Sequence, residues 1–170
     1  MLAINYQGDI IQQKAFYFEK TNNYYDEKGE SLARNFLKSP VKYTRISSGF
    51  GRRRHPITHR HHKHLGTDYV APRGTPVWAI ASGRIIKKGY TKFNGNYLAI
   101  RHNKGFETYY LHLSRFKKGI KVRQKVKQKD VIAYVGSTGR SSGPHLHLSV
   151  KSRGRFINPL KLKRIKSSSL

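Results

Sequence analysis

After Pro40 the chain is divided into short β-branched and aromatic runs that glycine interrupts at close intervals. Runs of this length predict strands, and the dipeptides Asn94-Gly95 and Lys104-Gly105 between them are typical of turns. In the run 96–102 we expect the even-numbered side chains on one face of a sheet and the odd-numbered ones on the other. The predicted strands are 75–81, 84–88, 96–102, 106–113, 130–135 and 145–151. This pattern predicts a mostly β fold, an antiparallel sheet domain over residues 41–160.

The first 40 residues follow a different pattern. Apolar residues at 32, 33, 36 and 37 recur with the period of a helix, and Ser39-Pro40 would end that helix. We predict one short helix at about residues 27–38, preceded by a strand or two over residues 1–25. We therefore expect an N-terminal flank, 1–40, that is the end of an upstream region, and a basic, serine-rich tail at 161–170.

The composition excludes several classes of protein. Because the chain has no cysteine, it cannot contain a disulfide framework, a cysteine-ligated zinc finger, an iron–sulfur cluster or a thiol nucleophile. Its longest apolar runs, such as Val131–Val135, are far shorter than the roughly 20 residues that a membrane-spanning helix needs. Residues Met1–Ile11 include Asp9 and lack a positively charged start followed by an apolar core, so we expect no secretory signal there.

Charge is distributed unevenly along the chain. The net charge is +27, from 35 Lys and Arg against 8 Asp and Glu. Such a field attracts nucleic acid, anionic lipid or an acidic polymer without specifying which, and lysines scattered over surface turns fit an ordinary solvated surface equally well. The useful consequence concerns the acids. After residue 30, only Asp68, Glu107 and Asp130 can supply a carboxylate.

Nine histidines is a high number for this length, and five of them lie between residues 54 and 64. For four of the five, no other potential metal ligand lies at a spacing that would single the histidine out. We therefore favour the interpretation that these four lie in an exposed loop. They are His55, His59, His61 and His62. His64 differs because Asp68 follows it by four residues. Gly66 and the residues around it disfavour a helix, so we expect a loop that leads into a strand, with an exposed ion pair as the alternative.

Two further histidines, His145 and His147, lie in one predicted strand. Residues i and i+2 of a strand point to the same face, so the two imidazoles lie side by side while Leu146 and Leu148 face the opposite way. The alternative is an exposed polar face. His112 is likewise flanked by apolar residues that point away from it.

These side chains are complementary in ligand type. Two neutral imidazoles and one carboxylate form a zinc site with an open fourth position, as used for hydrolysis. Zinc lowers the pKa of a bound water towards about 7 and polarises a carbonyl oxygen. His64, Asp68 and one of His145 or His147 are the predicted ligands, which leaves His112 and the remaining imidazole as general base and oxyanion donor. The motif His-Glu-x-x-His does not occur, so a histidine base is required.

An ordered series of motifs carries a resemblance to a known family. The motifs are Ser48-Gly-Phe-Gly-Arg52, Arg54-His-Pro-Ile57, His64-Leu-Gly-Thr-Asp68, Gly74-Thr-Pro-Val77, Tyr110-Leu-His-Leu113, Gly136-Ser-Thr-Gly139, Gly143-Pro-His-Leu-His147 and Asn158-Pro159. Over about residues 47–160 the chain resembles the lysostaphin-type (LytM domain) zinc metallopeptidases, which cleave peptide bonds in bacterial peptidoglycan. The flank around Tyr24–Ser31 and Phe36–Val41 resembles more narrowly the murein DD-endopeptidases of Gram-negative bacteria, which hydrolyse the D-alanyl-meso-diaminopimelate cross-bridge.

The resemblance implies a role for each candidate residue. It implies that His64, Asp68 and His147 bind one zinc ion, that His112 and His145 are the catalytic pair, and that Asn96 and Tyr110 line the substrate groove. The implied fold is a mostly antiparallel β domain with its site in an open cleft. Ser149 departs from the pattern, because the family often has an acidic residue at that position.

The resemblance also implies a substrate and a place of action. The implied partner is the stem peptide of peptidoglycan, with no specific nucleic acid, and the implied location is the periplasm or cell envelope. One alternative is a non-catalytic LytM module that binds the wall or activates an amidase, but such relatives typically lose zinc ligands, and this chain keeps them. Another alternative is nucleic-acid binding by charge, for which no recognition motif is present.

Overall fold

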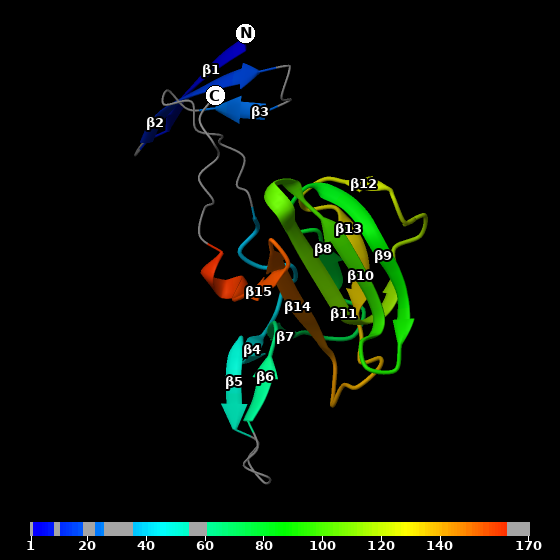
Figure 1. The fold of residues 1–170 in the computed structure, drawn as a ribbon. Coiled ribbons are helices and arrows are strands. Elements are labelled where there is room, and N and C mark those ends of the chain that lie inside the picture. Colours follow the sequence, from blue (N-terminus) through cyan, green and yellow to red (C-terminus); the bar gives the residue numbers. More distant parts are fainter. Residues whose placement is uncertain (1, 9–10, 19–22, 26–35, 55–60, 163–170) are drawn as a thin grey trace. The chain divides into compact units, whose positions relative to one another are not determined.

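The computed structural model describes residues 2–8, 11–18, 23–25, 36–54 and 61–162 (Figure 1). The chain divides into two compact units, one formed by residues 1–36 with 163–170 and the other by residues 37–162. The predicted division into 1–40, 41–160 and 161–170 stays a prediction.

The first unit contains a small antiparallel sheet with the strand order β1-β2-β3. Its strands are β1 (Leu2–Gly8), β2 (Ile11–Phe18) and β3 (Asn23–Tyr25). The register runs from Leu2 opposite Tyr17 to Gly8 opposite Ile11. The sequence predicted one or two strands in this region, and the structure has three.

The short helix predicted at about 27–38 is not seen. Its larger part lies outside the described residues, and Phe36–Lys38, which are described, are not helical. The backbone N–H of Leu37 donates to the carbonyl of Ile80 at 2.7 Å, so this segment is tied to the second unit and not to a helical turn. In the described part of the chain the helices are two 3-10 turns, η2 (Asn103–Gly105) and η3 (Pro159–Lys161). Among those residues no helix has the length and apolar character needed to cross a membrane.

The second unit is built on a ten-stranded sheet, which confirms the predicted antiparallel β fold. The main path of the sheet is β12-β9-β10-β11-β14-β7-β4, and β13, β8 and β15 pair off this path. All of these pairings are antiparallel. The strands are β4 (Arg45–Ser48), β7 (Thr67–Val70), β8 (Pro76–Trp78), β9 (Gly83–Thr91), β10 (Gly95–Arg101), β11 (Phe106–Phe116), β12 (Lys125–Val126), β13 (Val131–Val135), β14 (His145–Ser152) and β15 (Arg155–Ile157). A separate hairpin joins β5 (Gly51–Arg54) to β6 (His61–His64).

Strand β11 changes partner along its length. Its first residues pair with β14, whereas Leu113–Phe116 pair with β13, which in turn pairs with β8 (Figure 1). Leu98, Ala99 and Ile100 of β10 are all fully buried. Both faces of the sheet are therefore covered at this point, the face of the even-numbered Leu98 and Ile100 as well as that of the odd-numbered Ala99.

A bulge in β11 interrupts the register with β10. Leu98 lies opposite Tyr110 but Asn96 lies opposite Leu113, so Leu111 and His112 together face one residue of β10. His112 has a φ of 60°, in the left-handed region that non-glycine residues rarely adopt. Bulges of this kind change the direction of a side chain, and strained backbone is common at functional sites. The bulge therefore marks His112 as a residue to locate in the site.

Candidate metal centre

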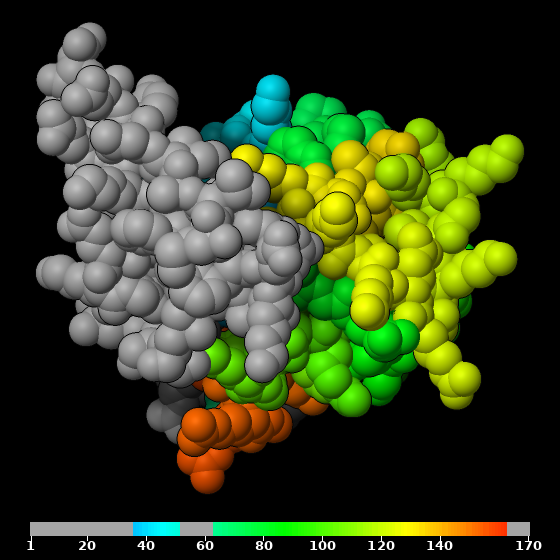
Figure 2. Space-filling view, turned by 90° about the horizontal axis from the view of Figure 1, so that it is seen from above, coloured from blue at the N-terminus to red at the C-terminus, as the bar shows by residue number. Residues whose placement is uncertain are grey.

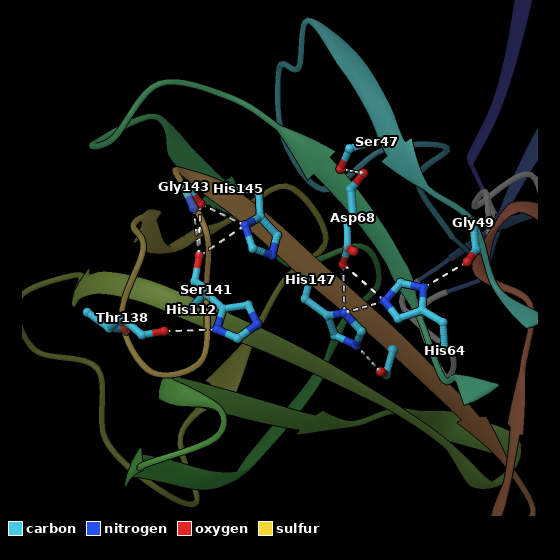
Figure 3. A network of polar contacts seen from close by, with 11 residues as sticks. Ser47, Gly49, His64, Asp68, His112, Thr138, Ser141, Gly143, His145 and His147 are labelled. Atoms are coloured by element: carbon cyan, nitrogen blue, oxygen red, sulfur yellow. Dashed lines mark hydrogen bonds and ion pairs between the residues drawn. The ribbon is translucent and has the colours of Figure 1, made fainter. Parts of the chain in front are cut away.

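Three of the predicted ligands converge on one point (Figure 3). The Nδ1 atom of His147 lies 2.7 Å from Oδ1 of Asp68 and 3.0 Å from Nε2 of His64, and the last two atoms are 3.2 Å apart. The three side chains are 11–15% exposed. This arrangement follows from the strand register, because His147 of β14 lies directly opposite Asp68 of β7 and His64 ends β6, which immediately precedes β7.

Gly66 allows this close approach. It is buried between β6 and β7, and a Cβ atom at this position would lie 2.5 Å from both Nε2 of His147 and the carbonyl oxygen of Leu148. Contacts that short would force His147 or Leu148 to move. Glycine is therefore the residue that fits between His64 and Asp68 without a shift of β14.

The Asp68 carboxyl is ionised in this surrounding. Burial alone would raise its pKa, but the close polar contacts with the His147 and His64 imidazoles outweigh burial and hold the pKa well below its usual range. An ionised carboxylate is the form that binds a cation. The group is thus ready to act as a ligand at neutral pH.

The orientation of the His64 ring is fixed from its far side. Its Nδ1 atom lies 2.7 Å from the carbonyl oxygen of Gly49. Because a carbonyl oxygen only accepts, Nδ1 carries the proton and Nε2 keeps a lone pair directed to Asp68 and His147. On His147 the far nitrogen, Nε2, lies 2.8 Å from Oγ of Ser149.

This donor set fits zinc. Two imidazole nitrogens and one carboxylate oxygen are the ligands of hydrolytic zinc sites, and tetrahedral zinc with bonds of about 2.0–2.1 Å separates its ligand atoms by about 3.3–3.4 Å. The observed separations of 2.7–3.2 Å need to widen by only a few tenths of an ångström.

Two more imidazoles lie beside this triad. The ring centroids of His112 and His145 are 4.8 Å apart, and His112 lies 6.1 Å from His147. Their Nδ1 atoms face carbonyl oxygens, of Thr138 at 2.9 Å and of Gly143 at 2.8 Å. By the same reasoning as for His64, each Nδ1 carries a proton and each Nε2 has a lone pair.

The His112 side chain is neutral near pH 7. Burial lowers its pKa below 6.5, and this effect outweighs the opposing hydrogen bond to Thr138. A neutral imidazole can accept a proton. The bulge in β11 and the Thr138 carbonyl together give His112 the form and position that a general base needs.

The structure corrects the prediction for Tyr110. Its side chain is fully buried, and its hydroxyl accepts a hydrogen bond from the backbone N–H of Ile80 at 3.0 Å. Such a side chain cannot line an open groove, because it belongs to the core beneath the sheet. The family resemblance alone had implied the groove position, and in this chain the Tyr110 side chain faces inward.

Asn96 has a supporting position. Its side-chain amide donates to the carbonyl oxygens of Leu113 and Ser114 at 3.1 and 3.3 Å, across the bulge that displays His112. A part for Asn96 in the groove stays a prediction.

Beside His145, residues Gly139–Ser142 line an open hollow of about 430 Å³. Ser141 places its hydroxyl 3.2 Å from Nδ1 of His145.

Sequence reasoning missed the groups that orient the histidines. Gly49, Thr138 and Gly143 act through backbone carbonyls, which leave no signature in side-chain type. Ser149 stood out only as a departure from a family pattern.

Comparison with known proteins decides the family. The family model of peptidase family M23 matches residues 62–159, which include the four histidines and the one aspartate of the site. The chain belongs to peptidase family M23. The resemblance to the lysostaphin-type peptidases is thereby confirmed.

Among curated M23 relatives, the peptidoglycan DD-endopeptidase ShyC of Vibrio cholerae is 44% identical over 153 residues, covering 89% of this chain and 35% of that protein. The DD-carboxypeptidase/endopeptidase Mpg of Neisseria meningitidis is 48% identical over 137 residues, covering 79% and 31%. This M23 chain thus spans about a third of the length of these relatives.

Solved structures show the same fold. A zinc-containing peptidase from Vibrio cholerae superposes with a TM-score of 0.73 at 40% identity, over 95% of this chain and 50% of that one. The catalytic domain of lysostaphin from Staphylococcus simulans gives a TM-score of 0.60 at 33% identity, over 68% of the M23 chain and 89% of the lysostaphin domain.

Proposed function

We propose that this M23 chain is a zinc-dependent endopeptidase that hydrolyses peptide cross-links of bacterial peptidoglycan, at the bond between D-alanine and meso-diaminopimelate. The observation that carries the proposal is the meeting of His64, Asp68 and His147 beside two imidazoles whose Nε2 atoms have lone pairs. The activities for which ShyC and Mpg are named support the choice of substrate.

His64, Asp68 and His147 would hold one zinc ion through Nε2, a carboxylate oxygen and Nδ1. Zinc bound there supplies Lewis-acid activation of water and of a carbonyl group. The Asp68 carboxylate contributes the negative charge that a divalent cation favours, and the two imidazoles bind as neutral ligands.

His112 and His145 move the protons of the reaction. Hydrolysis of an amide requires a base that takes a proton from water and an acid that returns one to the leaving nitrogen. A single imidazole Nε2 can do both in turn. The second imidazole, once protonated, donates a hydrogen bond to the oxygen on which charge develops in the transition state.

The substrate would lie along the hollow at Gly139–Ser142, next to His145. Stem peptides carry several carboxylates, and the excess of basic residues attracts them. Seven bases between residues 117 and 130 are exposed, and Figure 2 shows the yellow side chains of this segment projecting from the surface.

We place the enzyme in the periplasm or cell envelope. In this proposal residues 41–160 are the catalytic domain, between the flank 1–40 and the tail 161–170.

The proposal is tested by incubating the purified chain with cross-linked muropeptide dimers and zinc, and by analysing the products by mass spectrometry. We expect monomers from the wild-type chain and intact dimers after chelation or with His64→Ala. His62→Ala, two residues earlier in β6, is the matched control and should keep its activity. Dimers that survive the wild-type, zinc-loaded chain would contradict the proposal.

A further inference from the structure

One histidine of the centre is oriented differently from the others. The nitrogen of His147 that points away from the metal ligands faces a hydroxyl group, Oγ of Ser149, at 2.8 Å. Each of the other three imidazoles has its Nδ1 atom next to a backbone carbonyl oxygen, which can only accept a hydrogen bond (Figure 3). These carbonyls belong to Gly49 for His64, to Thr138 for His112 and to Gly143 for His145.

A hydroxyl differs from a carbonyl because it both donates and accepts. With Ser149 as donor, Nε2 of His147 holds the lone pair and Nδ1–H donates to Asp68, 2.7 Å away. With Ser149 as acceptor, Nε2 carries the proton and the lone pair of Nδ1 is directed to the point where His64 and Asp68 converge. Only the second arrangement allows His147 to bind a metal ion.

The contact between Ser149 and His147 lies in a buried environment, where a lost hydrogen bond is costly. Ser149 and His147 are both buried, so bulk water cannot easily replace the hydroxyl. The two residues are neighbours on one face of β14, two positions apart. Among the described residues, the Ser149 hydroxyl makes no other hydrogen bond.

We propose that Ser149 is the positioning residue for the ligand His147: in the metal-loaded chain its hydroxyl accepts a hydrogen bond from Nε2–H of His147 and thereby directs the lone pair of Nδ1 to the metal. The inference rests on the metal site of the proposed function. An imidazole bound to a cation is a stronger donor than a neutral one, so the hydroxyl contributes more to the loaded form than to the metal-free form. Removing the hydroxyl therefore weakens metal binding and does not simply destabilise the fold.

The test measures the dissociation constant for zinc by competition with a fluorescent chelator. For Ser149→Ala we expect binding about 10–100-fold weaker than in the wild type, the usual cost of losing such a partner. Ser149→Thr keeps the hydroxyl and should recover most of the affinity. Ser114→Ala is the matched control, since it removes a hydroxyl that bonds the carbonyl of Tyr134 at 3.2 Å away from the metal ligands. Circular dichroism of each metal-free variant checks that it folds.

A spectroscopic signature supplies the second readout. In 15N-labelled, zinc-loaded protein we expect a protected proton on Nε2 of His147, which exchanges faster with solvent in Ser149→Ala. An unchanged zinc affinity in a folded Ser149→Ala chain, or a proton on Nδ1 of His147 in the loaded wild type, would overturn the proposal. A wild-type chain that binds zinc but leaves dimers intact contradicts the proposed function alone, whereas one that binds no zinc contradicts both.

Discussion

At the scale of single residues, His112 combines a strained backbone with an imidazole nitrogen, Nε2, that has no hydrogen-bond partner among the residues the structure describes. Its φ of 60° is sustained by the bulge in β11 and by the bond from Nδ1 to Thr138. Strain of this kind persists only where the surrounding structure enforces it. The strain is a structural reason to separate His112 from the metal ligands in function.

We predict that His112→Ala loses activity but keeps its metal. Loss of a general base lowers kcat by about 10²–10⁴-fold, and no ligand atom is removed. The measurement pairs kcat on muropeptide dimers with the zinc content per chain. His64→Ala is the contrasting variant, because it should lose zinc and activity together. A loss of zinc in His112→Ala would instead make His112 a ligand.

The site was predictable from sequence where side-chain type carries the chemistry. Asp68 is one of three carboxylates after residue 30, and its spacing from His64 singled out both residues. Strand periodicity put His145 and His147 on one face but could not say which is the ligand, because both share that face. Only the family resemblance made the choice. The carbonyl partners of the rings depend on tertiary structure, which sequence periodicity does not encode.

At the scale of elements, the turn between β6 and β7 is closely packed against the metal ligands. We predict that Gly66→Ala lowers the free energy of unfolding by about 1–3 kcal/mol and weakens zinc binding, since its Cβ would meet His147 and Leu148 at 2.5 Å. Urea denaturation and chelator competition measure the two effects. Gly49→Ala is the control, because a Cβ there meets nothing within 4 Å. Equal stability of the two variants would contradict this account.

A second element-scale feature is the buried network beneath β11. Nδ1 of His102 lies 2.9 Å from the carbonyl of Ser82, and Nε2 lies 2.8 Å from Oγ1 of Thr108, which contacts the Tyr110 hydroxyl. Burial lowers the pKa of His102 below 6.5, more than the bond to Ser82 raises it. The folded state therefore favours the neutral ring.

This network predicts a pH dependence of stability. Because the pKa of His102 is lower in the folded chain than in the unfolded chain, its contribution is complete above about pH 6.5 and is lost as the pH falls below that value. Urea midpoints of metal-free protein between pH 5 and 8 measure it. His102→Gln, which stays neutral, should show a smaller loss on acidification. An identical pH dependence of stability in the wild type and in His102→Gln would rule out His102 as the cause.

Elements were predictable to different degrees. Each of the six predicted strand ranges overlaps one observed strand, because long β-branched runs between glycines have few alternatives. These strands are β8, β9, β10, β11, β13 and β14. The strands β4, β12 and β15 have two to four residues and carry too little periodicity to be recognised. The inward position of Tyr110 was missed for a different reason, since both faces of the sheet at β10 and β11 are covered.

At the scale of the whole molecule, the excess of positive charge modifies the function without defining it. A field from 35 bases attracts any polyanion, whereas the proposed chemistry depends on one carboxylate and four imidazoles. The fold places these five groups together by pairing β14 with both β7 and β11. Because β14 pairs with strands that lie far from it in the sequence, the predicted ligands are far apart in the chain and adjacent in space.

The most direct test of the central claim is the bond that the zinc-loaded chain hydrolyses. Purified D-Ala-meso-diaminopimelate cross-linked dimers are digested in heavy-oxygen water, and the products are weighed by mass spectrometry. We predict two monomers, with one heavy oxygen on the carboxyl group of the newly freed D-alanine and none on the diaminopimelate monomer. Intact dimers, or heavy oxygen at another bond, would contradict the claim that this chain is a cross-link endopeptidase.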